Sequence, residues 1–201
     1  MSTAEPVTNK GRETRDRIVD TAAALVFERG VAGTTLDDVR AAAKVSKGQL
    51  YHYFADKDDI VHAVIDRSVE LVIDAQPRLA NLTSWTAIAA WFDDLVRLQA
   101  ERNAVGGCPI GSLAGELAET DEYARAALAA GYDRWEAPIR AGLEQMRAAG
   151  KLRPGADPSR LATATLASIQ GGLVLTQTRR DPQQLRIALD AAYAYLRSYA
   201  A

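Results

Sequence analysis

The fold is indicated most directly by residues 34–57, which read TTLDDVRAAAKVSKGQLYHYFADK. In this stretch, Thr35 and Asp38 have the spacing of a capping box, in which a hydroxyl and a carboxylate satisfy exposed backbone amides where a helix begins. Ser46 and Gln49 repeat this spacing eleven residues later. The pattern therefore predicts two short helices in close succession, joined by a tight turn, which is the arrangement of a helix-turn-helix.

Helical spacing of apolar residues continues over the rest of the chain, and no strand-like alternation competes with it. Gly30 is expected to end the first helix in the left-handed conformation, and the acid-proline pairs at Asp157 and Asp181 are expected to start the last two helices. The sequence predicts an all-α fold of about nine helices. The predicted segments are residues 12–29, 35–43, a helix beginning at 46, residues 56–76, a helix containing 85–96, a break at 106–109, a helix containing 128–146, and the two final helices.

The composition is that of a folded protein, since 48% of the 201 residues are hydrophobic, 25% are charged and only seven are prolines. No apolar run approaches the roughly 18–20 residues that a membrane helix needs, and residues 1–10 lack the apolar core of a signal peptide. The single cysteine, Cys108, excludes an intrachain disulfide and fits a reducing compartment. We therefore expect a cytoplasmic protein.

The net charge of −2 excludes a uniformly basic coat for nucleic acid, so any DNA-binding surface must be local. Residues 1–57 hold nine Lys or Arg and eight Asp or Glu, whereas the remainder holds fifteen and eighteen. The basic residues near the predicted helix ends and turns of the N-terminal part are Lys10, Arg12, Arg15, Lys44, Lys47 and Lys57.

Residues 34–57 resemble the signature of the TetR family along their whole length. The resemblance rests on the small residue Ala42, the apolar turn residue Val45, the block LYHYF at 50–54 and the Asp-Lys pair that follows it. It implies a DNA-binding domain in residues 1–55 and a ligand-sensing and dimerisation domain in residues 56–201. It also implies a homodimeric repressor that responds to a small-molecule effector. Two symmetry-related recognition helices require a roughly palindromic operator. We expect the effector to release the DNA by shifting the helix from Asp56, which connects the two domains.

The second capped helix is the candidate recognition helix, because the N-terminal residues of a helix in the major groove reach base edges first. Lys47 can contact a phosphate or a guanine, Gln49 can pair with adenine, and Gly48 lets the backbone approach closely. Alternatively, the Gln49 side chain only closes its capping box. The full set of candidate DNA contacts, to bases or phosphates, is Thr34, Thr35, Ser46, Lys47, Gly48, Gln49, Tyr51, His52 and Lys57.

Neither a metal nor a cofactor is predicted from the remaining residues of this region. Tyr53 and Phe54 are expected to be core residues that pack the recognition helix on its neighbours. His52 and His62 are ten residues apart, a spacing that suits neither adjacent helical turns nor a compact metal site.

Two apolar seams in the final helices predict a four-helix interface between two subunits, although they could instead complete the core of one chain. The seams are Leu161, Thr165, Ile169 and Leu173, and Leu185, Leu189, Ala192, Tyr193 and Leu196.

A ligand site between helices should be mostly apolar with a few polar groups. The candidate walls, each of which could also be an ordinary core residue, are Trp91, Phe92, Tyr132, Trp135 and Met146. The candidate polar groups are Gln99, Arg102, Cys108 and Gln170.

Residues 106–113, with Cys108 among them, resemble a segment of the LmrA/YxaF-like subgroup of the TetR family, which includes repressors that respond to electrophiles. The thiol could be a sensor that an electrophile enlarges, or a small buried hydrophobic group, which is the usual role of a free cysteine.

An enzyme is disfavoured, because both histidines lie in or just after the DNA-binding segment and no phosphate-binding glycine loop follows a strand. A DNA-binding protein without ligand control shares every N-terminal feature and stays an alternative.

Overall fold

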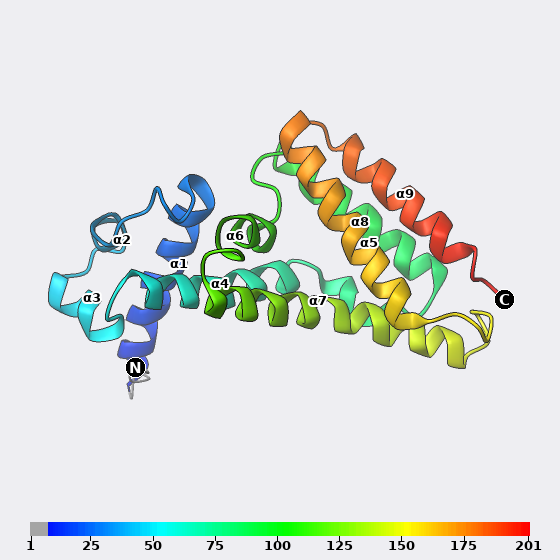
Figure 1. Ribbon diagram of the computed structural model, residues 1–201, viewed down its shortest axis with the longest axis horizontal. Helices are drawn as coiled ribbons and strands as arrows, with labels where there is room; N and C mark the ends of the chain where they lie inside the picture. Colours follow the sequence, from blue (N-terminus) through cyan, green and yellow to red (C-terminus); the bar gives the residue numbers. More distant parts are fainter. Residues whose placement is uncertain (1–7) are drawn as a thin grey trace. The chain divides into compact units, whose positions relative to one another are not determined.

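The computed structural model describes residues 8–201, and these form nine α-helices and one short 3-10 helix without any named strand (Figure 1). The predicted all-α fold is confirmed. The first seven residues, which are part of the segment considered as a possible signal peptide, lie outside the described range. The helices are α1 (Asn9–Arg29), α2 (Leu36–Ala42), α3 (Lys47–Tyr53), α4 (Lys57–Asp74), η1 (Pro77–Asn81), α5 (Trp85–Glu101), α6 (Pro109–Leu117), α7 (Glu122–Ala148), α8 (Pro158–Arg179) and α9 (Gln183–Arg197).

The chain forms two compact units, and each contains two separate stretches of sequence. Unit 1 consists of the chain up to Leu71 together with Ser112–Gly131, and unit 2 consists of Val72–Gly111 and Tyr132–Ala201. Unit 1 contains the predicted DNA-binding residues, most of α4, most of α6 and the beginning of α7. Helices α4, α6 and α7 each have residues in both units.

Helix α1 begins three residues before the predicted start, because the hydroxyl of Thr8 accepts a hydrogen bond from the Gly11 amide and caps the helix. At its other end, Gly30 has φ 74° and ψ 170°, and its N–H donates to the Val26 carbonyl. The positive φ explains the glycine, but ψ differs from the left-handed conformation that we predicted.

Both predicted capping boxes are present in the helix-turn-helix. Thr35 and Asp38 exchange hydrogen bonds at the start of α2, and Ser46 and Gln49 do so at the start of α3. The turn between the helices contains Lys44 with φ 55°. The two helices are therefore held by local contacts that the sequence alone encodes.

The first unit has a core of aliphatic and aromatic side chains that come from α1, the helix-turn-helix and α4. The predicted core residues Tyr53 and Phe54 are both buried. The buried apolar residues of this core include Ile18, Val19, Ala22, Val26, Val39, Val45, Leu50, Ile60, Val61, Val64 and Ile65.

In unit 2, helices α8 and α9 pack on each other, and α9 also packs on α5. A Cβ on Gly172 would lie 2.8 Å from the Leu185 side chain, so glycine permits this close approach. The hydroxyl of Thr176 accepts a hydrogen bond from the Leu185 amide near the start of α9. Helix α9 begins at Gln183, just after Pro182, while the Asp181 carboxylate accepts from the Gln183 amide.

The prediction that these seam residues form the subunit interface is therefore wrong. Almost all of the seam residues are buried within the single chain, and Tyr193 is half-buried. The seams complete the core of unit 2, as the alternative interpretation required, because each helix buries its most apolar stripe against its own neighbour.

Candidate nucleic-acid interface and sensing residues

Helix α3 has one buried face and one exposed face. Leu50 and Tyr53 fix it to the core of unit 1. The exposed residues are Lys47, Gly48, Gln49, Tyr51 and His52, all of which are candidate DNA contacts. A Cβ on Gly48 would meet no atom within 4 Å, so the backbone there is open to a close partner.

Gln49 makes the cap contact that we considered as an alternative to base recognition. Its Oε1 accepts a hydrogen bond from the Ser46 amide at 2.9 Å, and its own amide donates to the Ser46 hydroxyl at 3.1 Å. In this conformation the Nε2 group keeps its hydrogen-bonding capacity, because the cap uses only the oxygen. Cap formation and donation to a base acceptor are therefore compatible in one rotamer.

The side chains of Thr34 and Lys57 have hydrogen-bond partners within the chain. Thr34 is only 3% exposed, and its hydroxyl donates to the Gly30 carbonyl at 2.9 Å. Lys57 is half-buried, and its Nζ donates to the Val31 carbonyl at 2.6 Å. Both residues stabilise the turn between α1 and α2 in this structure, and their contacts to DNA stay a prediction.

The two capping hydroxyls are exposed but already engaged. The Thr35 hydroxyl contacts Asp38 Oδ2 at 2.6 Å, and the Ser46 hydroxyl accepts from the Gln49 amide. A hydroxyl oxygen has two lone pairs, so each of these hydroxyls can accept a further hydrogen bond while it keeps its present one. Because these two residues are exposed, the N-termini of α2 and α3, with their free backbone N–H groups, lie at the surface.

Helix α1 supports the helix-turn-helix through two contacts that the sequence did not predict. Arg17 Nε donates to the carbonyl of Ala43, which lies at the end of α2. The guanidinium of Arg15 lies over the Phe54 ring, 5.5 Å from its centre. Both contacts join residues that are far apart in sequence, so helical periodicity gave no indication of them.

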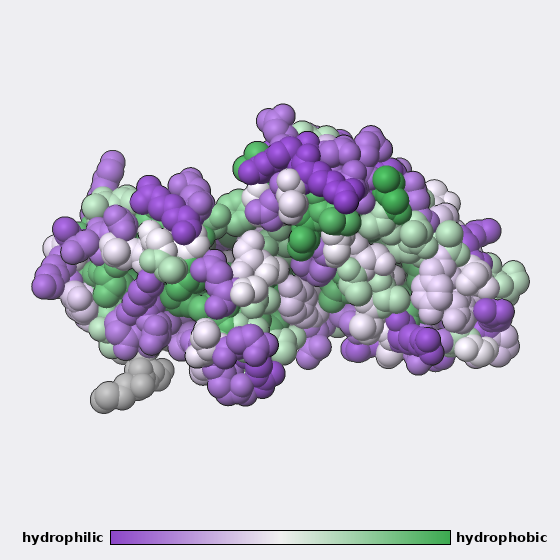
Figure 2. Space-filling model, turned by 45° about the horizontal axis from the view of Figure 1, so that its top comes forward, coloured by the Kyte–Doolittle hydropathy of each residue, from purple (hydrophilic) through white to green (hydrophobic). Residues whose placement is uncertain are grey.

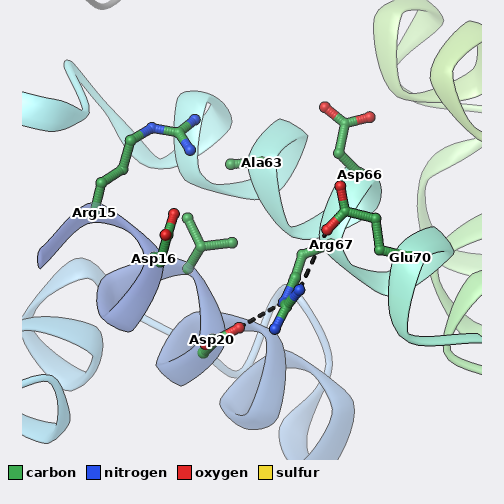
Figure 3. A pocket seen from close by; sticks show the side chains of 8 residues that line it. Arg15, Asp16, Asp20, Ala63, Asp66, Arg67 and Glu70 are labelled. Carbon is green, nitrogen blue, oxygen red and sulfur yellow. Dashed lines mark hydrogen bonds and ion pairs between the residues drawn. The ribbon is translucent and has the colours of Figure 1, made fainter. Parts of the chain in front are cut away.

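A polar hollow of about 460 Å³ lies between α1 and α4 in unit 1 (Figure 3). In it, Arg67 of α4 donates to Asp20 of α1 at 2.6 Å and to Glu70 at 3.3 Å. The hydrogen bond to Asp20 is the main reason that the pKa of Arg67 is raised. This ion pair fixes α1 against α4. The hollow is lined by Arg15, Asp16, Val19, Asp20, Ala63, Asp66, Arg67 and Glu70.

Three of the predicted ligand-binding residues meet around Gly111 in unit 2. Gln170 Nε2 lies 3.5 Å from the Cys108 sulfur. A Cβ on Gly111 would lie 2.8 Å from Gln170 Oε1, 3.5 Å from Cys108 and 3.7 Å from the Tyr132 hydroxyl. We call these four residues the Gly111 cluster. It brings together an amide, a phenol and a thiol from α6, its preceding turn, α7 and α8.

Burial controls the ionisation of the Gly111 cluster. Cys108 is buried, and loss of solvation raises the pKa of its thiol. Burial, and then the nearby thiol, raise the pKa of Tyr132 to about 12. Both groups are therefore neutral near pH 7, and Cys108 is a protonated thiol.

Apart from Tyr132, the predicted walls of the ligand site are buried side chains in this structure. Trp91 and Trp135 are fully buried, and both indole N–H groups donate to one oxygen, Gln76 Oε1, at 3.0 and 3.3 Å. Gln76 in turn donates to the Val72 carbonyl near the end of α4. Gln76 ties the end of α4 to α5 and α7, a role that no sequence pattern predicted. Phe92 and Met146 are also buried.

Gln99 differs from the other buried polar groups. It is 4% exposed, and its Oε1 has no hydrogen-bond partner among the described residues. An unpaired buried oxygen is unfavourable by about 1–3 kcal/mol, so this atom is suited to receive a donor from outside the chain. Arg102, the other polar candidate on this part of the chain, is exposed.

Two family models match this chain, one in its N-terminal part and one in its C-terminal part. A family model described as "Bacterial regulatory proteins, tetR family" matches residues 18–64, and one described as "Tetracyclin repressor-like, C-terminal domain" matches residues 85–192. The chain belongs to the TetR family. TetR-family proteins are transcriptional regulators and not enzymes, and they bind operator DNA as homodimers.

Individual relatives agree with the TetR assignment over most of their length. An uncharacterised helix-turn-helix regulator of Lactococcus lactis is 30% identical, with 89% of this chain and 91% of that protein covered. The transcriptional repressor DhaR of a Mycobacterium species is 27% identical, with 85% and 86% covered. A TetR regulator of Chloroflexus aurantiacus has a TM-score of 0.81 and 31% identity, with 96% and 98% covered.

The reduced form of NemR from E. coli has the same fold, with a TM-score of 0.80 and 24% identity over 94% of this chain and 97% of that one. These TetR matches do not distinguish the LmrA/YxaF-like subgroup. Among the described residues, no helix is both long enough and apolar enough to cross a bilayer.

Proposed function

We propose that this TetR-family protein is a repressor that binds a roughly palindromic operator as a homodimer and is released when a small molecule binds unit 2. The observation that carries the proposal is the exposed N-terminal face of α3, which is held in place by a complete capping box and a buried opposite face. A helix presented in this way can enter the major groove with its first residues foremost.

Within this proposal, the contacts to bases come from Lys47 and the Gln49 amide nitrogen, with the backbone at Gly48 close to the DNA. Tyr51 and His52, which are exposed on the same helix, contact phosphates. The internal contacts of Thr34 and Lys57 give them the role of shaping the preceding turn.

The proposed dimer forms through residues of α8 and α9 that the chain leaves exposed. Val174 is 58% exposed and Ile187 is 64% exposed, and Figure 2 shows hydrophobic areas on the part of the surface formed by these helices. Small residues on the same faces allow close approach of a second copy. The exposed stripe comprises Thr163, Ala167, Gly171, Val174, Leu175 and Thr178 on α8 and Ile187, Ala191 and Ala194 on α9.

The proposed sensor is the Gly111 cluster, with the free oxygen of Gln99 as a further candidate contact. The cluster offers hydrogen-bonding groups that are partly or fully buried, which is the combination expected of a small-molecule site. Membership of the LmrA/YxaF-like subgroup is a part of this proposal that rests on the sequence resemblance. The neutral, buried thiol favours reversible binding over reaction with electrophiles.

Release requires coupling between the ligand and the DNA-reading helix, and α4 is the proposed link. Its 18 residues extend about 27 Å at 1.5 Å per residue. Gln76 fixes the end of α4 to two helices of unit 2. A ligand that prefers the released arrangement would tilt α4, whereas a ligand of equal affinity for both arrangements would change nothing.

Footprinting of purified protein on DNA upstream of its own coding region, with and without metabolite extracts, tests this function. We expect protection of two equivalent half-sites and its loss with an active extract. Protection that no extract alters, together with the absence of thermal stabilisation by any extract, would favour a DNA-binding protein without ligand control. Full protection by Lys47→Ala/Gln49→Ala double variants would contradict the assignment of α3.

A further inference from the structure

In the turn between α1 and α2, one residue, Val31, is hydrogen-bonded to side chains from two different helices. The amide of Val31 donates to Glu116 Oε2 of α6 at 2.8 Å. The carbonyl of Val31 accepts from Lys57 Nζ of α4 at 2.6 Å. Both backbone groups of Val31 are thus satisfied by charged side chains, and charge-assisted hydrogen bonds are stronger than neutral ones.

The turn is shaped to receive the Glu116 carboxylate. A Cβ on Gly30 would lie 3.1 Å from both carboxylate oxygens, which is closer than a normal contact. Gly30 also has a positive φ, and its carbonyl accepts from the buried Thr34 hydroxyl. The carboxylate therefore lies directly against the backbone of the turn, and a side chain at Gly30 would displace it.

Helix α6, which carries Glu116, also carries Gly111. The helix starts at Pro109 in unit 2, and its residues from Ser112 onward belong to unit 1. Glu116 lies five residues after Gly111 in the same helix. Helix α6 therefore carries one residue of the Gly111 cluster and, later in its sequence, the carboxylate that contacts the turn before the helix-turn-helix.

We propose that Glu116 is a positioning residue for DNA binding, through which α6 holds the turn between α1 and α2 and so sets the orientation of the helix-turn-helix. This inference rests on the proposed function. Glu116 does not contact DNA; it acts through Val31. A movement of α6 changes the carboxylate-to-amide contact before it changes anything within α3.

The variants Glu116→Ala and Glu116→Gln test this role. Alanine removes the hydrogen bond, whereas glutamine keeps an acceptor oxygen and removes the charge. The matched control is Glu119→Ala, because Glu119 is also exposed and follows α6 by two residues. Operator affinity is measured by fluorescence anisotropy on the footprinted DNA, and the exchange rate of the Val31 amide is measured by NMR.

We expect Glu116→Ala to raise the Kd for operator roughly three- to tenfold and to speed exchange at Val31. Glu116→Gln should restore most of the affinity, and Glu119→Ala should equal the wild type in both measurements. The melting temperature should stay nearly constant, because the carboxylate is at the surface.

Wild-type operator affinity in Glu116→Ala, with faster exchange at Val31, would overturn the inference and leave the repressor function intact. Loss of affinity with faster exchange throughout unit 1 would indicate a general loss of stability and would also overturn it. Absence of operator binding by the wild-type protein would overturn the proposed function and this inference with it.

Discussion

Gln49 combines a capping role and a proposed DNA-reading role that one substitution can separate. Glutamate in its place keeps the acceptor for the Ser46 amide, since Glu is the usual partner in a capping box, but it removes the amide donor and adds a negative charge. We predict that Gln49→Glu melts within about 1–2 °C of the wild type, because the cap remains. Its operator affinity should fall at least tenfold, since base contacts of this kind contribute about 1–3 kcal/mol.

The control for this prediction is Gln145→Glu, which makes the same charge change at an exposed position of α7. Anisotropy titrations and thermal melts of both variants check it. Unchanged operator affinity in Gln49→Glu would leave Gln49 with the capping role alone.

Cys108 should make the protein less stable at alkaline pH. Burial raises the pKa of the folded thiol above its ordinary value of 9.0, so the unfolded thiol ionises first. The free energy of unfolding should then fall by up to about 1.4 kcal/mol per pH unit as the pH rises above this value, until the folded thiol also ionises. Tyr132, with a pKa raised to about 12, adds a second decline at higher pH.

Urea denaturation of the wild type, Cys108→Ser and Tyr132→Phe between pH 8 and pH 11 checks this prediction. Just above pH 9, the free energy of unfolding of Cys108→Ser should fall less steeply with pH than that of the wild type. For Tyr132→Phe, the difference from the wild type should appear only near pH 11. Identical slopes in the wild type and Cys108→Ser would show that the thiol does not contribute.

The exposed stripe on α8 makes a prediction at the level of the helix. Val174→Glu should convert the dimer to a monomer, because a buried carboxylate without a partner costs several kcal/mol at an interface. The control is Val105→Glu, since Val105 is a comparably exposed valine at 53%, in the loop after α5. Light scattering during gel filtration measures both masses, and a Val174→Glu dimer would contradict the proposed interface.

Helix starts were predictable wherever the signal lies within a few residues. The capping boxes of α2 and α3 and the Asp157 cap of α8 were predicted correctly, because each depends only on local spacing. Helix α6, at Pro109–Leu117, was not predicted, because it is short and follows a glycine-rich turn that was interpreted as a break between helices. The dimer seams were wrong because periodicity reveals an apolar face without showing what covers it.

The functional contacts that were missed join residues far apart in the chain. Glu116 and Val31 are separated by 85 positions, and Gln76 and Trp135 by 59. Each pair combines residue types that are ordinary at a protein surface or in a core. No local pattern identifies them, so only the folded chain brings these partners together.

At the scale of the whole molecule, the net charge of −2 makes DNA binding depend on a few local cations. We predict that operator affinity falls steeply with salt, because each neutralised phosphate contributes about 0.9 to the slope of log K against log salt. If Lys47 contacts a phosphate, Lys47→Ala should reduce that slope by roughly two in a dimer, whereas Gln49→Ala should leave it unchanged. Titrations from 50 to 300 mM KCl check this, and an unchanged slope in Lys47→Ala would exclude its phosphate contact.

The shared acceptor of Trp91 and Trp135 also gives the protein a native optical probe. Two fully buried indoles that donate to one amide oxygen should emit at short wavelength and give a strong near-ultraviolet dichroism signal. Helix α4 ends beside Gln76, so a shift of α4 would alter both indoles at once. Ligand titrations could therefore be followed by intrinsic fluorescence without a label, and Gln76→Glu would identify the part of the signal that arises at this oxygen.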